Sequence, residues 1–284
     1  MDIPRRDVDF DFDPEAVPID WCDSGAYQTT FMAALSLLFP EGERFFVDSV
    51  KRVAGKLGRI DDPELQRAIT GFIGQEAMHG KEHRAFNQLL VAHGHDEAPR
   101  VDAGLRRFLE RVRQILPPMS RLAVTCALEH FTAMLAEQLL RDPRMQAEFH
   151  ETVRPLWLWH ALEESEHKAV AFDVYRAAGG GYARRVAMML VTTIVFFAAQ
   201  GLVHARLMAT RKVLFKPWRW LRGIRHMWIW PGYFTRLAPA YLAYFRPGFH
   251  PDDRDTTALL ARWRDALFGT NGQLAERTRV TNAA

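Results

Sequence analysis

Cysteine is scarce in this chain of 284 residues. Its two cysteines, Cys22 and Cys126, are far apart, and neither belongs to a Cys-x-x-Cys pair. We therefore expect neither a disulfide scaffold nor a zinc or iron–sulfur site with cysteine ligands. The first 20 residues are acidic and lack the apolar core of a signal peptide, so a cytoplasmic protein is expected.

The sequence also lacks the alternation of apolar and polar residues that marks half-buried strands. It contains no solenoid repeat and no low-complexity tract. Apolar residues recur instead at helical spacing, so we predict an all-α fold without a sheet. Proline and glycine divide the helical part into four runs: Tyr27–Phe39 broken by Pro40 and resumed over Glu41–Val53; Asp61-Asp62-Pro63 to His93; Asp102 to Leu140 with a break at Pro117-Pro118; and Met145–Ala178 with a kink at Pro155.

Acidic residues are missing from one long stretch. Residues 174–251 contain no Asp or Glu but 12 Lys and Arg. Outside this stretch, 25 basic residues face 34 acidic ones, a balance of −9, although the whole chain carries +3. The chain is therefore electrically divided into a mostly acidic part and a basic, aromatic-rich segment, which bears on its partners.

Glutamate and histidine recur at metal-ligand spacing, one group in each predicted helical run. Residues three, four and seven apart lie on one stripe of a helix. A two-metal carboxylate site in a four-helix bundle uses one Glu from each of two helices and a Glu-x-x-His pair from each of the others. The chain contains these groups in order: Glu43, Glu76-x-x-His79, Glu129, and His160 followed by Glu164-x-x-His167.

Each of these motifs alone is more often a solvated helix face than a site. Their conjunction among apolar residues favours a metal centre, because buried acids need partners. We predict two metal ions, with iron first and manganese or zinc as alternatives. His83 and His130 are not predicted to be ligands, but His83 is a candidate for supporting the ligands without binding metal itself. Glu163 and Asp173 are candidates for orienting the ligating imidazoles.

The motifs FPEGERFF, GQEAMHGKEH, LEHFT and WHALEESEHKAVAFDVY resemble those of a bacterial family of predicted metal-dependent hydrolases, over about residues 25–250. The ligand order is also similar to that of the ferritin-like p-aminobenzoate N-oxygenases, which carry an extra His four residues before the second Glu-x-x-His. The resemblance implies seven ligands: Glu43, Glu76, His79, Glu129, His160, Glu164 and His167. The basic segment has no counterpart in the N-oxygenases, so their amine substrate is not carried over.

The basic segment admits three interpretations. Val186–Ala205 has 20 residues without a charge, which is long enough to cross a hydrocarbon core of ~30 Å. Four tryptophans follow between positions 218 and 230. Nucleic-acid binding does not explain the apolar run, and a buried bundle helix does not explain the basic flanks. Association with a membrane surface explains both, and we favour it.

We therefore expect four parts: an irregular segment (1–20), a ferritin-like four-helix bundle with the di-metal site (21–180), an apolar and basic helical appendage at the inner face of the cell membrane (181–251), and a helix with a tail (252–284). The preferred function is an O₂-using oxygenase or oxidase acting on a small, lipid-like substrate. The alternatives are a hydrolase with a metal-bridged water and a non-enzymatic metal-binding bundle. No nucleic-acid partner is expected, and a homodimer is compatible with the sequence.

Overall fold

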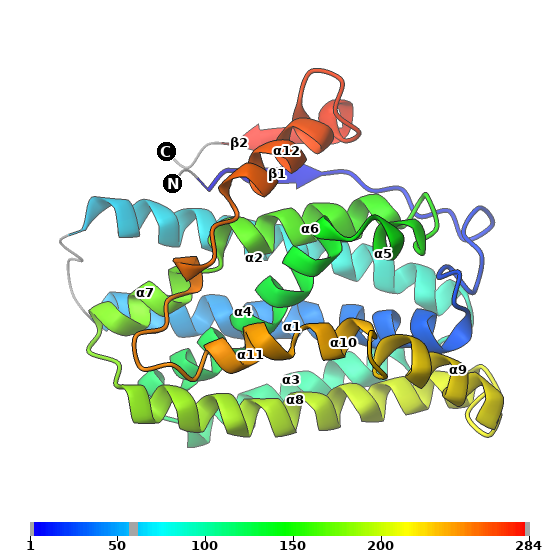
Figure 1. The fold of residues 1–284 in the computed structure, drawn as a ribbon, viewed down its shortest axis with the longest axis horizontal. Coiled ribbons are helices and arrows are strands. Elements are labelled where there is room, and N and C mark those ends of the chain that lie inside the picture. The colour runs from blue at the N-terminus through cyan, green and yellow to red at the C-terminus, as the bar shows by residue number, and fades with distance from the viewer. Residues whose placement is uncertain (1–2, 57–61, 282–284) are drawn as a thin grey trace.

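The computed structural model of the chain describes residues 3–56 and 62–281, so the outermost positions of the two terminal segments and Asp61 lie outside the described residues. Helices dominate these residues, and the all-α class is confirmed (Figure 1). The elements are β1 (Arg5–Val8), α1 (Ala26–Lys56), α2 (Pro63–Ala92), α3 (Ala98–Ile115), α4 (Pro118–Arg141), α5 (Pro143–Ala147), α6 (Arg154–His167), α7 (Val170–Ala177), α8 (Tyr182–Thr210), α9 (Pro217–Met227), α10 (Tyr233–Arg236), α11 (Ala238–Ala243), α12 (Thr257–Phe268) and β2 (Thr278–Thr281), with short 3₁₀ turns at Pro251–Asp253 and Ala275–Arg277.

Helices α1 and α4 form the middle of the molecule. Helices α2 and α6 pack on one side of them, and α8 runs along the other side (Figure 1). The buried apolar residues form two clusters rather than one. Along α1 and α2, the change from one cluster to the other falls at Glu43 and Glu76, and Glu164 lies between Leu162 of the first cluster and Val170 of the second. The predicted metal ligands therefore occupy the junction of the two apolar cores.

The predicted break at Pro40 is wrong, because α1 continues through it. Proline has no N–H, so the carbonyl of Ser36, four residues earlier, loses its helical partner. The side chain of Asn87 on α2 replaces that partner by donating from Nδ2 to the Ser36 carbonyl over 3.2 Å. A tertiary hydrogen bond thus compensates for the lost helical one.

The fourth predicted run is divided into α5, α6 and α7, so the single helix kinked at Pro155 is also wrong. Pro155 lies in the first turn of α6, where its missing N–H has no helical acceptor to lose. In the second run, Asp62 caps α2 as expected by accepting hydrogen bonds from the amides of Glu64 and Leu65.

The absence of a sheet is a third incorrect prediction. Strands β1 and β2 pair antiparallel, with Arg6 opposite Val280. Each strand has only four residues, too few for alternation to be visible in the sequence. The segment ending in β1 packs closely on α2, where a Cβ on Gly71 would lie 2.5 Å from Ile3. This approach directs the side chain of Arg6, in the middle of β1, into the protein interior.

Candidate metal centre

The seven residues predicted as ligands converge from α1, α2, α4 and α6, and each is at most 5% exposed. They form three overlapping groups whose potential ligand atoms lie within 4.8 Å of one another: Glu43, His79 and His160; Glu76, Glu129 and His167; and Glu76, His79 and Glu164. These groups can hold metal ions.

The distances link the groups into one continuous cluster. His167 Nε2 lies 3.1 Å from Glu76 Oε1 and 3.6 Å from Glu129 Oε2. Glu164 lies in the middle: its Oε1 is 3.0 Å from His160 Nε2, and its Oε2 is 3.7 Å from His167 Nε2. This central position arises because the three α6 residues share one helix stripe.

The carboxylates of the cluster are buried without adequate partners among the described residues. Both oxygens of Glu43, Glu76 and Glu129 lack a hydrogen bond, as do Nδ1 of His79 and Nε2 of His167. Buried polar atoms normally find partners, since each unpaired one costs free energy. The unpaired atoms belong to the same groups that can coordinate a cation, so the donor set fits a metal site.

The electrostatics of the cluster point the same way. Burial raises the pKa of Glu43 and Glu129 well above the ordinary range of a carboxyl group, and it also raises the pKa of Glu76. Burial lowers the pKa of His79, but the proximity of Glu163 and Glu164, whose oxygens lie 3.1 and 3.5 Å from its ring nitrogens, outweighs this and raises the pKa to about 10. The cluster therefore attracts positive charge strongly, whether protons or metal cations.

The second nitrogen of two histidines is fixed by an outer hydrogen-bond network. His79 Nε2 lies 3.1 Å from Glu163 Oε2, and His167 Nδ1 lies 2.9 Å from Gln75 Oε1. Gln75 in turn donates to Glu166 over 2.8 Å. The network ends at two arginines: Arg6 donates to Glu163 and Glu166, each over 2.8 Å, and Arg264 donates to Glu166 over 2.6 Å.

Sequence reasoning found only part of this network. Glu163 was expected to orient an imidazole, and the structure places it on His79 rather than on His160 of its own helix. Gln75, Glu166, Arg6 and Arg264 were missed. No pattern marked the arginines, since β1 and α12 lie far from α6 in sequence.

His160 is positioned by a chain of hydrogen bonds that begins at Pro40. Asn87 donates to the Ser36 carbonyl that Pro40 leaves free, and this turns Asn87 Oδ1 toward the Ser36 hydroxyl, which donates to it over 2.7 Å. The same hydroxyl oxygen then accepts from His83 Nδ1 over 2.8 Å. His83 Nε2 is thereby left to accept from His160 Nδ1 over 2.6 Å. The Nε2 lone pair of His160 consequently faces the cluster.

Two residues considered from the sequence lie outside the cluster. Asp173 pairs instead with His250, over 2.8 Å, at a partly exposed surface. His130 lies 3.0 Å from the carbonyl of Ala240.

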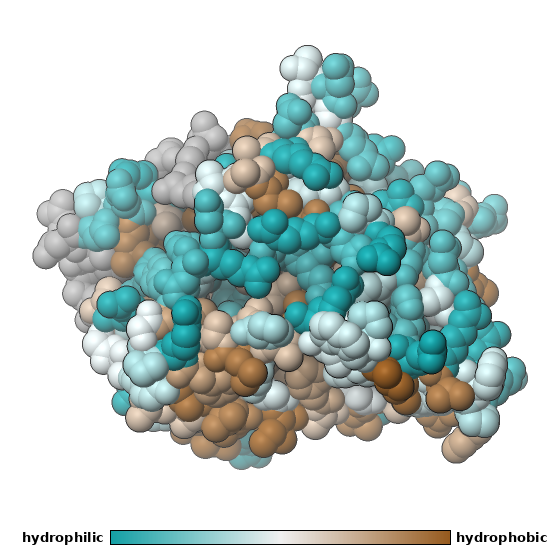
Figure 2. Space-filling view, viewed as in Figure 1, coloured by the Kyte–Doolittle hydropathy of each residue, from teal (hydrophilic) through white to brown (hydrophobic). Residues whose placement is uncertain are grey.

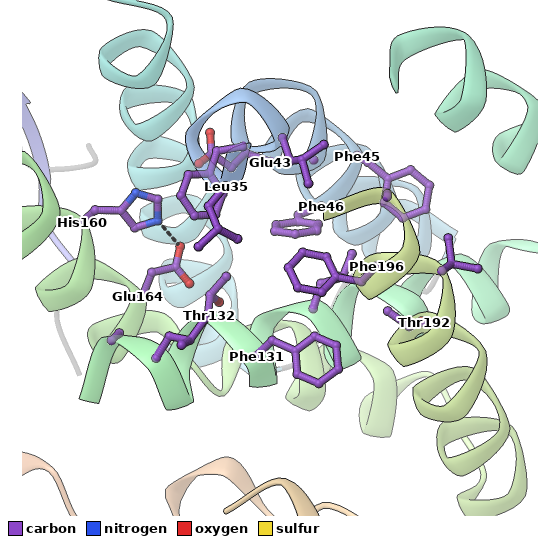
Figure 3. A pocket seen from close by; sticks show the side chains of 18 of the residues that line it. Leu35, Glu43, Phe45, Phe46, Phe131, Thr132, His160, Glu164, Thr192 and Phe196 are labelled. Atoms are coloured by element: carbon purple, nitrogen blue, oxygen red, sulfur yellow. Dashed lines mark hydrogen bonds and ion pairs between the residues drawn. The ribbon is translucent and has the colours of Figure 1, made fainter. Parts of the chain in front are cut away.

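A cavity of about 230 Å³ adjoins the cluster. Glu43, His160 and Glu164 line one end of it, and the rest of its wall is largely apolar and comes from α1, α3, α4 and α8 (Figure 3). Phe196 and Thr192 of α8 lie toward the other end (Figure 3). A molecule in this cavity would meet the cluster on the side of Glu43 and His160.

A family model described as predicted metal-dependent hydrolase matches residues 4–255. No curated protein and no solved structure matches the chain.

Proposed function

Because the chain belongs to the family of predicted metal-dependent hydrolases, we propose that it is a hydrolase whose buried Glu and His cluster binds two divalent metal ions. The observation that carries the proposal is the convergence of buried carboxylates that lack hydrogen-bond partners. We interpret α1, α2, α4 and α6 as a ferritin-like bundle around this centre.

The number of two ions is supported by the charges. Glu43, Glu76, Glu129 and Glu164 have no Lys or Arg within ion-pair distance in the described part of the chain, whereas Glu163 and Glu166 are already balanced by Arg6 and Arg264. Two divalent cations would neutralise the four inner carboxylates. Buried charges are tolerated only when they are compensated in this way.

The residues divide naturally between two ions. Glu43, His79 and His160 would hold one ion, and Glu129 and His167 the other. Glu76 and Glu164 lie against histidines of both groups and would serve both ions. Iron is the metal we expect for this mixed set of carboxylate and imidazole ligands, with manganese or zinc as alternatives.

A bound divalent metal lowers the pKa of water and polarises the group to be cleaved. The chain contributes positioning around that chemistry. His83 holds the Nδ1 proton of His160, and Glu163 fixes the ring of His79. The apolar cavity wall keeps bulk water from the cluster, which strengthens electrostatic interactions within it.

The test is metal analysis of protein purified without oxygen, followed by assays of ester and phosphoester hydrolysis. We expect about two divalent ions per chain and hydrolysis that stops on chelation and returns when metal is restored. Protein that hydrolyses equally well after complete metal removal would contradict the proposal, as would protein that takes up no metal.

An oxygen-using enzyme is the second candidate, and the largely apolar cavity beside the cluster favours it. Such a wall suits an apolar substrate better than a polar scissile bond. Admitting O₂ to the protein loaded with ferrous iron separates the two. Rapid O₂ consumption with a change in the visible spectrum would favour the oxygenase, whereas a centre that hydrolyses substrate and is inert to O₂ would favour the hydrolase.

A further inference from the structure

One side of α8 is left uncovered by the rest of the described chain. Only 22% of its most apolar 18-residue stretch is buried. The large exposed side chains of this stretch are Leu190, Val191, Ile194, Val195 and Leu202, which are 40–72% exposed. They repeat at helical spacing and form one stripe along the helix. Figure 2 shows this apolar surface along the edge of the molecule where α8 lies in Figure 1.

The opposite side of α8 is anchored to the bundle by polar contacts. Gln200 donates to the carbonyl of Phe31 over 2.8 Å, and His204 Nε2 lies 3.1 Å from the carbonyl of Tyr27. Both contacts reach α1, so α8 lies lengthwise on the bundle. A membrane span would have to break them, whereas a helix lying in the membrane interface keeps them and covers the exposed stripe.

The apolar surface continues onto α9 and its neighbouring loops. Phe215, Trp218 and Trp230 are 92%, 75% and 73% exposed. Basic side chains surround them, and in the described structure none of the following six makes an ion pair: Arg206, Lys212, Lys216, Arg219, Arg222 and Arg225. All six are exposed. Unpaired basic residues next to exposed tryptophan match the interface of a bilayer that contains anionic lipid.

The cavity beside the cluster reaches the same surface. Phe108 of α3 and Val191 and Val195 of α8 line it, yet they are 46%, 50% and 40% exposed. The cavity wall at the other end includes Glu43 and His160, which are almost fully buried (Figure 3). The cavity thus extends from the apolar surface between α3 and α8 to the cluster.

We infer that the face formed by α8 and α9 docks on an anionic lipid bilayer, and that the cavity between α3 and α8 admits an apolar substrate from that bilayer to the cluster. The positive charge of the face favours an anionic bilayer over a second copy of the chain, because two such basic faces would repel each other. The substrate class rests on the proposed metal function, whereas the docking does not.

Docking is tested by co-sedimentation of the full chain with vesicles of phosphatidylcholine alone or mixed with phosphatidylglycerol. We expect binding only to the mixed vesicles, with part of it lost at high salt. Ile194→Asp, in the middle of the exposed stripe, and the double change Arg222→Glu with Arg225→Glu should each weaken binding at least about tenfold. Matched controls are Val280→Asp on β2 and Arg67→Glu with Arg262→Glu, on the side of the molecule away from α8, which should bind as the unaltered chain does.

The cavity is tested with a dansyl-labelled fatty acid, whose fluorescence increases in apolar surroundings. Val191→Trp places an indole ring in the cavity wall at the surface and should remove most of the probe binding without reducing vesicle binding. Ile194→Trp is the control, because this neighbouring exposed residue does not line the cavity.

Three outcomes would overturn the inference: a chain that stays in the supernatant with mixed vesicles at low salt, a face that instead forms a dimer which Ile194→Asp dissociates, or equal probe binding by the two tryptophan variants. Metal content measured on the same samples keeps the two proposals apart. A chain that binds vesicles and probe but no metal would leave the docking intact and refute the metal function.

Discussion

At the scale of single residues, the properties of the inner carboxylates distinguish a metal centre from a polar core that is only structural. Glu129 has no hydrogen bond in the described structure, and burial raises its pKa well above the ordinary range. An unpaired buried carboxyl destabilises a protein, whereas a coordinated one supports the bound ion. The same substitution should therefore act in opposite directions with and without metal.

We expect Glu129→Gln to lower metal content by about half or more. In metal-free protein, the same change should raise the free energy of unfolding by about 1 kcal/mol or more, because it removes a buried carboxyl that must either stay charged or take up a proton, without changing volume. Metal analysis and thermal unfolding of both forms measure these effects. Leu128→Ala is the control, and it should keep the metal and lose packing only. An unchanged metal content in Glu129→Gln would remove Glu129 from the ligand set.

The hydrogen-bond chain behind His160 makes a second prediction at this scale. Ser36→Ala removes the acceptor of the His83 Nδ1 proton, so His83 no longer holds His160 in one tautomer. Loss of such an outer partner typically weakens metal binding about 10–100-fold. Metal affinity measured by competition with a chelator should fall within that range. Ser49→Ala is the matched control, since Ser49 is also buried in α1 but, among the described residues, its hydroxyl bonds to the carbonyl of Phe45 alone.

The residues of the cluster were predictable because each motif lies within one helix and follows helical spacing. The residues behind them were not, since their partners come from other elements. Glu163 was singled out as a candidate three residues after His160, but its partner is His79, 84 positions away in sequence. Hydrogen bonds between distant segments leave no local pattern.

At the scale of elements, β1 and α6 depend on each other through Arg6 and Glu166. Burial raises the pKa of Glu166, but hydrogen bonds and charge from Arg6 and then Arg264 outweigh it and hold the pKa below the ordinary value. A carboxyl with a lowered pKa in the folded state contributes stability that is fully present above its unfolded pKa. That stability is lost as the pH falls through the folded value.

Arg6→Gln should therefore move acid unfolding to higher pH, because the pKa of Glu166 rises when its principal partner is removed. Circular dichroism recorded over an acid titration measures the midpoint. Arg5→Gln is the control: it lies in the same strand, but its side chain is exposed, makes no ion pair in the described structure and donates only a long hydrogen bond, over 3.8 Å, to the sulfur of Met78. Equal midpoints for the two variants would mean that the strand does not support α6 through Arg6.

The same dependence explains why element boundaries were harder to predict than helix content. The break expected at Pro40 does not occur, because Asn87 on another helix satisfies the carbonyl that the proline leaves free. The β1–β2 pair joins the two ends of the described chain, and no turn links its strands in the sequence. In both cases tertiary contacts override the local preference.

At the scale of the whole molecule, the acidic and basic parts of the sequence have different positions. Acidic residues occupy the buried cluster and much of the remaining surface, while the acid-free segment supplies α8, α9 and their exposed arginines. The apolar run of α8 and the excess of basic residues around it were visible in the sequence. The cavity was not, because its wall is assembled from α1, α3, α4 and α8, and only the packed fold brings these helices together.

The position of the cluster at the junction of the two apolar cores makes metal removal a test of the entire bundle. Without cations, four carboxylates at the centre of α1, α2, α4 and α6 repel one another or take up protons. A ligand that binds only the folded state at 100 times its Kd stabilises it by about 2.7 kcal/mol. We therefore expect chelation to lower the melting temperature by several degrees, and metal to restore it.

Hydrogen exchange shows where that stability is located. Metal removal should increase amide exchange around Glu43, Glu76, Glu129 and Glu164, which supply the inner carboxylates of the cluster. Exchange in α9 should stay unchanged, because α9 contributes none of the cluster residues. If chelation changed exchange equally throughout the chain, it would be acting on global stability alone. If it changed neither exchange nor the melting temperature, the buried carboxylates would be satisfied without a metal.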